Sequence, residues 1–398
     1  MSWKETDPMT ERMKFIIDYN RSSCSLAELC RRYNISRKTA YKWISRFKSY
    51  GCEGLKDRSR AHFTYPHSTP DSMIDAILEL KKERRTWGPK KLKIWLEINH
   101  PDQRWPSAST IGCILSKRGL VQPRKYKRYT APHPSPLTEC HAPNQVWCVD
   151  YKGQFRMGTD EYCYPLTITD NYSRFLFACD GAHQISGKNA QQSFERIFSE
   201  YGLPDVIRSD NGSPFASTGA GGLSALSVWW IKCGIFPERI KPGRPDQNGR
   251  HERMHKTLKE TIATLPSDNL IIQQQSFDAF IREYNEERPH ESLGNKRPAE
   301  VYKKSHRSLP NQLPEIEYDK RHVIRRVRQN GEIKWKGKKI YISQLLQKEP
   351  VGLLEINNDQ FDIYFGPVLL GTLSHQSCKL DKPPKPTRRY RKKETNDE

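Results

Sequence analysis

The stretch QVWCVDY, residues 145–151, combines the pattern of a buried strand with an acid at its end. Its β-branched and aromatic residues favour a strand, and Asp150 ends the apolar run. The stretch PDVIRSDNG, residues 204–212, has the same order, because a short strand is followed by Asp210 and a turn. Residues 164–182 between them are strand-like, and residues 187–202 form an amphipathic helical pattern. This order predicts an α/β domain built on a mixed sheet.

A third stretch, PGRPDQNGRHERMHKTLKE at residues 242–260, reads as the start of a charged helix. On a helical wheel Glu252 shares a face with three other polar residues, His255, Lys256 and Lys259. The opposite side is the apolar stripe of Met254, Leu258, Ile262 and Leu265. Glu252 is therefore expected to point away from the helix's own packing surface. Asp246 lies beside Gln247, Asn248 and Gly249, where capping of the helix is its natural role.

Two aspartates at strand ends and one glutamate on a helix can converge on one edge of a sheet. Carboxylate oxygens suit Mg²⁺ or Mn²⁺, and Mg²⁺ in particular keeps waters and binds substrate phosphate. Two such ions per site can activate a nucleophile and stabilise a leaving 3′ oxygen in an in-line phosphoryl displacement. We therefore predict that Asp150, Asp210 and Glu252 are both the catalytic residues and the metal ligands. Asp246 stays open as an alternative third acid.

The amino-terminal part, residues 9–55, has the layout of a helix-turn-helix domain. Three helical patterns follow one another, and Ser25 and Ser36 can cap the second and the third. The exposed start of the third helix carries the residues that we expect to contact DNA, Arg37, Lys38, Tyr41 and Lys42. An ordinary three-helix bundle without DNA binding is the alternative.

Residues 71–122 have a similar pattern, which predicts a second helix-turn-helix domain. The segments WGPKKLKIWLEI and WPSASTIGCILSKRGLV predict two helices joined by a loop with Pro101 and Pro106. Ser107, Ser109 and Thr110 begin the second expected recognition helix. Basic linkers are predicted at residues 56–70 and, rich in proline, at residues 123–143.

The carboxy-terminal part, residues 318–376, is predicted to be rich in β-strands. Hairpin-turn signals lie at residues 329–331 and 357–359, and five or so short strands suggest a small barrel. Residues 377–398 are a strongly basic stretch that we expect to be a disordered tail attracted to DNA.

Composition limits the class of protein. The chain has 398 residues, and 67 Lys and Arg against 46 Asp and Glu give a net charge of +21, which favours a polyanionic partner. No apolar run approaches the length of a membrane span, and the first residues lack the apolar core of a signal peptide. The ten cysteines include no C-x-x-C pair, which argues against a zinc knuckle and fits reduced thiols in a cytosol.

These motifs together resemble the integrase catalytic core, a ribonuclease-H-like domain of retroviral integrases and bacterial insertion-sequence transposases. The resemblance rests on Asp150 in VWCVDYKG, Asp210 in RSDNGSPF and the stretch at residues 242–260. The segment YNEERPHESLGNKRPAEVY and the pair of preceding helix-turn-helix units also match such transposases. The resemblance covers roughly residues 10–305.

The resemblance implies a multidomain fold. Its parts would be two all-α helix-turn-helix domains, an α/β ribonuclease-H-like core at residues 144–305 and a small SH3-like C-terminal β-barrel. The acidic triad falls on Asp150, Asp210 and Glu252, and the interval from Asp210 to the third acid is longer than in retroviral integrases. The surplus is the insertion STGAGGLSALSVWW, residues 217–230. Asp170 matches a recurrent family acid, which we interpret as orienting its turn with Arg174.

The implied activity is that of a transposase that binds terminal inverted repeats, frees 3′-OH ends and joins them to target DNA. Arg250, Lys256 and Lys259 would then contact DNA beside the metals. The implied partners are double-stranded DNA and further copies of the chain, as a homodimer or higher oligomer, in a bacterial cytoplasm and at its nucleoid. Two rivals stay open: a DNA-binding regulator with a vestigial core, and a plain ribonuclease-H-like nuclease.

Overall fold

The computed structural model describes residues 7–21, 24–58, 68–121, 137–158, 161–241, 245–262, 267–357, 360–374 and 380–381; the side chains of Pro245 and Asp246 are not included. Much of the two predicted linkers and of the predicted tail lies outside these residues, as do Leu265 and the side chain of Asp246. The chain divides into two compact units, residues 1–69 and 70–398. The domain boundaries predicted from the sequence stay predictions.

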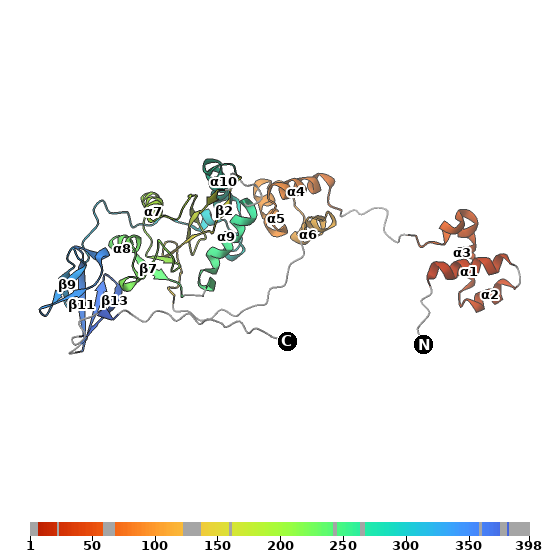
Figure 1. The fold of residues 1–398 in the computed structure, drawn as a ribbon. Coiled ribbons are helices and arrows are strands. Elements are labelled where there is room, and N and C mark those ends of the chain that lie inside the picture. Colours follow the sequence, from red (N-terminus) through yellow and green to blue (C-terminus); the bar gives the residue numbers. More distant parts are fainter. Residues whose placement is uncertain are drawn as a thin grey trace, which may run out of the picture. The chain divides into compact units, whose positions relative to one another are not determined.

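The first unit is a three-helix structure (Figure 1). Its helices are α1 (Pro8–Asn20), α2 (Leu26–Arg32) and α3 (Arg37–Tyr50), followed by the 3₁₀ turn Gly51–Leu55. Ser25 and Ser36 cap α2 and α3 as predicted, because their hydroxyls accept from the backbone N–H groups of Glu28 and Thr39. The apolar interior of this unit includes Leu29, Ala40, Trp43 and Ile44.

The second unit begins with three more helices, α4 (Asp71–Glu83), α5 (Pro89–Asn99) and α6 (Ala108–Lys117). Ser107 caps α6 by accepting from the Thr110 N–H at 3.1 Å. The core of this helical part consists of apolar residues from all three helices and the loops between them: Ile77, Leu80, Trp87, Leu92, Leu96, Trp105, Ile111 and Leu115. The sequence predicted α5 and α6, and α4 completes the unit.

The central sheet follows and has five strands in the order β5-β4-β1-β6-β7. These strands are β1 (Val146–Tyr151), β4 (Leu166–Asp170), β5 (Leu176–Asp180), β6 (Val206–Ser209) and β7 (Phe236–Arg239). Strands β6 and β7 run parallel to β1, whereas β4 pairs antiparallel with both of its neighbours, β1 and β5, so the predicted mixed sheet is confirmed. The short hairpin of β2 (Phe155–Arg156) and β3 (Tyr162–Cys163) lies apart from this sheet.

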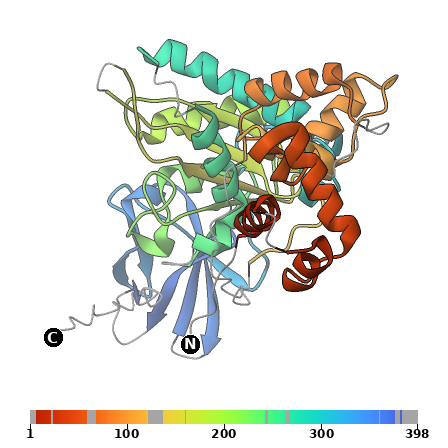
Figure 2. The same cartoon turned by 90° about the vertical axis from the view of Figure 1, so that its right-hand side faces the viewer.

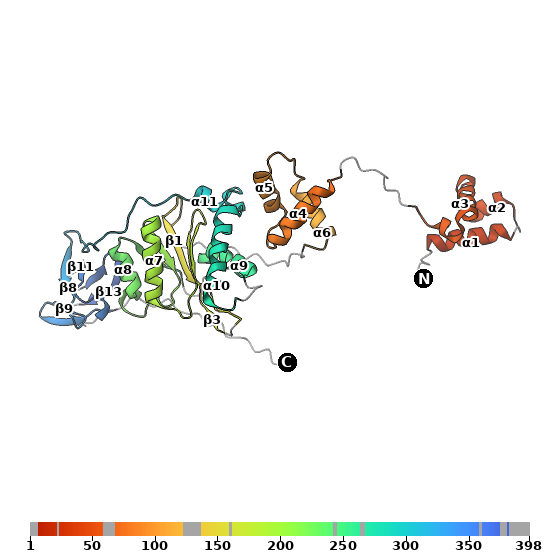
Figure 3. The same ribbon diagram turned by 90° about the horizontal axis from the view of Figure 1, so that it is seen from above.

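Helices cover both faces of this sheet, as Figure 3 shows. On one side lie α7 (Gly187–Tyr201) and α8 (Ala225–Lys232), whose apolar residues join those of β1, β4 and β6 in one core. On the other side lie α9 (Gly249–Ile262) and α10 (Leu270–Arg282). Their apolar residues, among them Met254, Leu258 and Phe277, pack against Leu176 and Cys179 of β5.

A helical arm follows α10 and leads to the carboxy-terminal region. It consists of the π-helical turn Glu283–Glu287, the 3₁₀ turn Glu291–Leu293 and α11 (Pro298–Val301).

The carboxy-terminal region is rich in strands, as predicted. A five-stranded sheet has the order β14-β13-β12-β11-β8, and β9 and β10 form a separate hairpin. The bounds are β8 His322–Arg326, β9 Glu332–Trp335, β10 Lys338–Tyr341, β11 Pro350–Asn357, β12 Gln360–Phe365, β13 Val368–Ser374 and β14 Leu380–Asp381, with the 3₁₀ turn Gln344–Leu346 after β10. Pairing among the described strands runs from β14 to β8 and stops there, so closure into an SH3-like barrel stays a prediction.

The first predicted hairpin turn is present, since the Arg328 N–H donates to the Glu332 carbonyl at 2.8 Å across residues 329–331. The strands that this turn connects, β8 and β9, find their main ladder partners elsewhere, in β11 and β10 respectively. The tight turn of the β9–β10 hairpin is Lys336–Gly337, where both residues have a positive φ, as two-residue hairpin turns require. The other prediction agrees with the structure, since β11 and β12 pair across residues 357–360.

The insertion at residues 217–230, which includes most of α8, packs against the carboxy-terminal region (Figure 2). It contains the 3₁₀ turn Ala220–Gly222, and its Leu223 and Val228, with Ile231 of α8, share one apolar core with residues of β11, β12 and β13. The ion pair between Lys232 Nζ and Glu349 Oε1, at 2.7 Å, joins the same two regions. The catalytic-core segment and the carboxy-terminal strands therefore form one packed body.

Candidate active site

The three predicted acids come from three elements of the second unit. Asp150 is near the end of β1, Asp210 directly follows β6, and Glu252 lies in the first turn of α9. Because β1 and β6 are parallel neighbours, their carboxyl ends lie at the same edge of the sheet. Helix α9 packs over the face of the sheet to which Asp150 belongs, since His255 Nδ1 lies 3.8 Å from Asp150 Oδ2.

The electrostatics of Asp150 link these three carboxylates. The pKa of Asp150 is raised to about 7, chiefly because burial disfavours its charged form. The negative charges of Asp210 and then of Glu252 raise it further, while the Tyr151 backbone N–H and Lys152 act in the opposite direction. Asp150 is thus close enough to both other acids to feel their charge. A nearby cation would stabilise the charged form of this buried carboxylate.

The turn after β6 fixes Asp210. Its Oδ1 accepts from the Gly212 N–H at 3.0 Å, and Asn211 Nδ2 donates to the Ile240 carbonyl at 2.6 Å. A Cβ atom on Gly212 would lie 2.9 Å from Asp210 Oδ2, so a side chain at this position would push against the carboxylate. Glycine at this position therefore leaves the carboxylate room to lie where it does.

The exposed side of α9 differs from the expected one in one residue. Glu252, Lys256 and Lys259 are exposed, and Lys256 pairs with Glu260 at 3.6 Å. His255, expected on the same face, is instead buried against the sheet, as is His251. The helical wheel placed His255 wrongly because position 255 lies at the boundary between the polar face and the stripe of Met254 and Leu258, and β4 offers it a polar partner.

That partner is Thr167, which faces Asp150 across the β1–β4 pairing. The Thr167 hydroxyl lies 2.8 Å from His251 Nε2 and 2.7 Å from His255 Nε2, and it donates to the Asp150 carbonyl at 2.9 Å. Burial lowers the pKa of His251 to about 3 and, with the neighbouring His251 and Lys152, that of His255 to about 2. Both rings are therefore neutral. The only sequence signal for them was two histidines four residues apart, flanking Glu252.

Asp170 orients its turn, but not with the expected partner. Its Oδ2 accepts from the N–H and the hydroxyl of Ser173 at 2.7 and 2.6 Å, and its Oδ1 accepts from the Asn144 N–H at 2.9 Å. Arg174 contributes its backbone N–H to the Asp170 carbonyl, and its guanidinium donates to Asn171 O instead. The hydrogen bonds from Ser173 and Asn144 therefore hold the Asp170 carboxylate in place.

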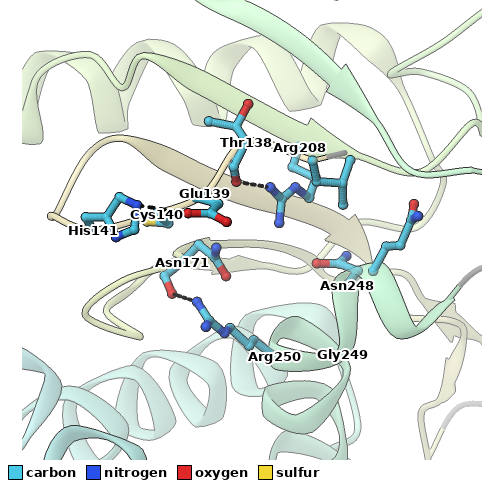
Figure 4. A pocket seen from close by; sticks show the side chains of 11 residues that line it. Thr138, Glu139, Cys140, His141, Asn171, Arg208, Asn248, Gly249 and Arg250 are labelled. Atoms are coloured by element: carbon cyan, nitrogen blue, oxygen red, sulfur yellow. Dashed lines mark hydrogen bonds and ion pairs between the residues drawn. The ribbon is translucent and has the colours of Figure 1, made fainter. Parts of the chain in front are cut away.

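A pocket of about 340 Å³ opens at the start of α9 (Figure 4). Residues 137–141, Asn171, Arg208 and residues 247–250 line it. Arg208 Nε donates to Glu238 at 2.6 Å and its Nη2 to the Thr138 carbonyl at 2.8 Å, while Arg250 donates to the Asn171 carbonyl at 3.1 Å. The helix that carries Glu252 therefore begins in a polar pocket lined by two arginines.

No pattern in the sequence predicts the contacts that hold α4 and α5 against the arm that follows α10. Trp87 Nε1 donates to Glu283 at 2.9 Å, Arg84 pairs with Glu287, and Lys90 pairs with Glu291 at 3.0 Å. Lys91 of α5 is close enough to Arg288 and Arg253 that burial and these two charges lower its pKa to about 7. The second helical part is thus anchored beside the helix of Glu252 by charged residues that look solvent-exposed in the sequence.

The predicted DNA-contacting residues of α3 and α6 are exposed. In α3 these are Arg37, Lys38, Tyr41 and Lys42, and in α6 they are Ser109 and Thr110, preceded by the cap residue Ser107. Lys42 Nζ lies 4.6 Å from the centroid of the Trp43 ring. The hydroxyls of Ser107 and Thr110 are 2.9 Å apart and belong to the helix cap. Arg250 is also exposed.

Hard carboxylate oxygens at the sheet edge fit a divalent cation such as Mg²⁺ in their chemistry. Within the described ranges, no three His, Cys, Asp or Glu side chains stand close enough together to hold a metal as they lie. Asp150, Asp210 and Glu252 therefore interact electrostatically without forming a ligand cluster as they lie.

Among the described residues, no helix is long and apolar enough to cross a bilayer.

Four family models match the chain. Two models of an integrase core domain match residues 140–245 and 233–298, a helix-turn-helix domain matches residues 11–61, and a homeodomain-like domain matches residues 39–115. The chain therefore carries an integrase core domain behind helix-turn-helix domains, and the resemblance inferred from the sequence is confirmed.

Among particular proteins, the chain is similar to those of bacterial insertion elements. It is 26% identical over 280 residues to the insertion element IS407 uncharacterized 31.7 kDa protein of Burkholderia multivorans, which covers 68% of this chain and 91% of that protein. It is 23% identical over 279 residues to the insertion element IS476 uncharacterized 39.2 kDa protein of Xanthomonas euvesicatoria, over 69% and 78% of the two chains. A match to the Gag-Pol polyprotein of baboon endogenous virus has 28% identity and covers 47% of this chain but 10% of the polyprotein.

Solved integrase structures are also among the matches. The HTLV-2 integrase catalytic core domain in complex with magnesium matches at 15% identity and a TM-score of 0.33, over 41% of this chain and 98% of that one. A simian T-cell lymphotropic virus intasome, in complex with the PP2A regulatory subunit B56 gamma, matches at 14% identity and a TM-score of 0.37, over 77% and 99%.

Proposed function

We propose that this protein is a transposase of the Asp-Asp-Glu type. In this proposal it binds the terminal inverted repeats of its element, cleaves DNA to free 3′-OH ends and joins those ends to target DNA. The observation that carries the proposal is the placement of Asp150 and Asp210 at the carboxyl ends of parallel neighbouring strands, with Glu252 in the first turn of the helix packed over them, inside an integrase core domain. The insertion-element relatives favour the same activity.

Asp150, Asp210 and Glu252 would hold divalent cations, two per site. Bound Mg²⁺ or Mn²⁺ supplies activation of the attacking oxygen and stabilisation of the leaving one. The chain's own part is to keep three carboxylates at one sheet edge and to leave Glu252 exposed on α9, where its side chain can reach toward the two aspartates. Lys256 and Lys259, exposed on the same helix, would contact DNA phosphates.

The remaining parts would bind and arrange DNA. The exposed starts of α3 and α6 would read the element ends, and the strand-rich carboxy-terminal region, as an SH3-like barrel, would grip the duplex. Pairing of two ends calls for a homodimer or a higher oligomer. The bacterial relatives favour action on double-stranded DNA in a bacterial cytoplasm, at the nucleoid.

A strand-transfer assay tests the proposal. Purified full-length protein is mixed with labelled element ends, target DNA and Mg²⁺ or Mn²⁺, and cleaved and joined products are counted separately. We expect joining by the wild type and none by Glu252→Gln, with end binding retained by both in a gel-shift assay. Glu260→Gln is the matched control, because Glu260 is another exposed glutamate of α9 and should join normally.

The rivals give different outcomes in this assay. Binding of ends with no product under either metal supports the regulator. Cutting without joining, and without need for end sequence, supports a plain nuclease. Loss of joining in Asp246→Asn but not in Glu252→Gln would keep the enzyme and move its third acid to Asp246.

A further inference from the structure

The network around Thr167 lies directly behind Asp150. Thr167 is the Cα partner of Asp150 in the β1–β4 pairing, so the two side chains point to the same face of the sheet. The Thr167 hydroxyl, His251 and His255 are all buried, with exposed fractions of 0%, 1% and 5%. Three polar partners meet at a single oxygen, Thr167 Oγ1, at distances of 2.7 to 2.9 Å.

Counting protons at this oxygen fixes the state of both histidines. A threonine hydroxyl has one hydrogen to donate and two lone pairs that accept. The Asp150 backbone carbonyl can only accept, so the single Thr167 hydrogen goes to it. Both Nε2 atoms must then donate to Thr167 Oγ1, and each neutral ring carries its hydrogen on Nε2. The hydroxyl of Thr169, 2.8 Å from His251 Nδ1, supplies the hydrogen that this second ring nitrogen accepts.

The count at Thr167 Oγ1 does not involve the Nδ1 of His255, and in a neutral ring with its hydrogen on Nε2 this atom is an acceptor. This atom lies 3.8 Å from Asp150 Oδ2, too far for a direct hydrogen bond, and both atoms are acceptors when Asp150 is ionised. Two acceptors side by side favour an occupant that offers hydrogens or positive charge to both. A water of a hydrated divalent cation offers both, and Mg²⁺ usually keeps several waters when it binds to protein.

From this geometry we propose that His255, held as the Nε2–H tautomer by Thr167, is a positioning residue for Asp150. Thr167 restrains the backbone of Asp150 by donating to the Asp150 carbonyl, and it holds His255 so that Nδ1 stays beside Oδ2, where both atoms would accept from the same cation-bound water. The inference rests on the proposed function, in which Asp150 is a metal ligand. Partners behind metal ligands commonly change metal affinity or activity by about 10- to 100-fold when they are removed.

A pair of substitutions at Thr167 isolates the hydroxyl. Thr167→Val removes the hydroxyl with little change in shape, and Thr167→Ser keeps it. Binding of Mn²⁺ to the full-length protein without DNA is followed by electron paramagnetic resonance, with thermal unfolding as a check on the fold. We expect affinity about 10- to 100-fold weaker in Thr167→Val and near the wild-type value in Thr167→Ser. Asp150→Asn in the same titration reports on the metal site itself.

A second measurement needs no substitution. In the wild-type protein labelled with ¹⁵N-histidine, nuclear magnetic resonance distinguishes Nε2–H from Nδ1–H rings. We expect Nε2–H for both His251 and His255. An Nδ1–H ring at His255 would overturn the inference whether or not any Thr167 variant folds.

The outcomes separate the inference from the proposed function. Equal Mn²⁺ affinity in Thr167→Val and wild type, with affinity lost in Asp150→Asn, overturns the positioning role and keeps the enzyme. Unchanged affinity in Asp150→Asn overturns the metal role of Asp150, and with it the proposed function. Weaker binding in Thr167→Val, restored in Thr167→Ser, supports the positioning role, since a merely structural hydroxyl would change only the unfolding temperature.

Discussion

On one face of the central sheet, β1 and β4 present Trp147, Val149 and Ile168 to helices α7 and α8. On the other face, the alternate residues of the same strands, Asp150 and Thr167, meet α9. The period of two in a strand separates the two sets. The first face is apolar and stabilises the fold by burial, whereas the second buries polar groups that need hydrogen-bond partners to be tolerated.

The comparison shows that the polar face of the sheet, and not the apolar one, has room for an active site. Trp147 packs at ring-centroid distances of 4.1 Å from Phe177 and 5.9 Å from Phe198, so it cannot change without a cavity. Across the sheet, the hydroxyls and imidazoles around Thr167 satisfy one another and restrain Asp150. Under the proposed function, stability and catalysis would therefore depend on residues that are neighbours in sequence but face opposite ways. Substitutions on the two faces should separate these properties.

The largest effect is expected for Asp150→Asn on the polar face. Strand joining should fall on the order of 10⁴-fold, about 5.4 kcal/mol of transition-state stabilisation, because a catalytic ligand is lost. The free energy of unfolding without metal should not fall, since the substitution removes a carboxylate whose charge the folded state disfavours. Joining assays and urea denaturation measure the two quantities. A destabilised Asp150→Asn would contradict the division between the faces.

The next effect is expected for Trp147→Ala on the apolar face. Removing this fully buried ring should lower the free energy of unfolding by roughly 3 to 5 kcal/mol, through lost burial and a cavity. Urea denaturation measures the change. In the molecules that remain folded, the Mg²⁺ concentration for half-maximal joining should stay that of the wild type. A shift in that concentration would show that the two faces are not independent.

A smaller effect concerns acid stability on the side of α9 and α10. Burial and the cations Lys91, Arg288 and Arg174 lower the pKa of His290 from 6.5 to about 3. Its contribution is therefore fully present above pH 6.5 and is lost as the pH falls toward 3, by up to about 1.4 kcal/mol per pH unit. His290→Gln should flatten the dependence of unfolding free energy on pH between 7 and 5. Equal slopes in His290→Gln and the wild type would contradict this prediction.

The smallest effect is expected for Lys259→Ala on the exposed side of α9. DNA-end binding should weaken modestly, and the slope of log affinity against log salt concentration should fall by about one, as for one lost phosphate contact. A salt series of gel-shift titrations measures it. An unchanged slope would mean that this lysine does not reach the phosphates, and would leave Arg250 and Lys256 as the remaining candidates on this helix.

The sequence predicted what local rules decide. Ser25 and Ser36 indicate helix starts by their residue type and spacing. Asp150 and Asp210 lie at the ends of strands that β-branched residues predict. The predictions failed where the position of a side chain depends on a partner that is distant in the chain. The burial of His255 depends on Thr167, which is 88 residues away in the chain.

The same reason explains the missed contacts of Trp87 and Arg84. Their partners in residues 283–287 are about two hundred positions away, and no local pattern predicts such pairs. Strand pairing is a related case. Residues 329–331 form a turn as predicted, but the strand that follows, β9, pairs along its length with β10. Turn residues predict a reversal of the chain but not which strands will pair.

The shared core between residues 220–231 and the carboxy-terminal strands has a practical consequence for the handling of this protein. A chain shortened to end near residue 310 would leave Leu223, Val228 and Ile231 without the side chains that cover them. An uncovered apolar patch of this kind promotes self-association. Biochemists who trim the molecule to its integrase segment should therefore expect precipitation, and the polar replacement of Val228 would be the first remedy to try.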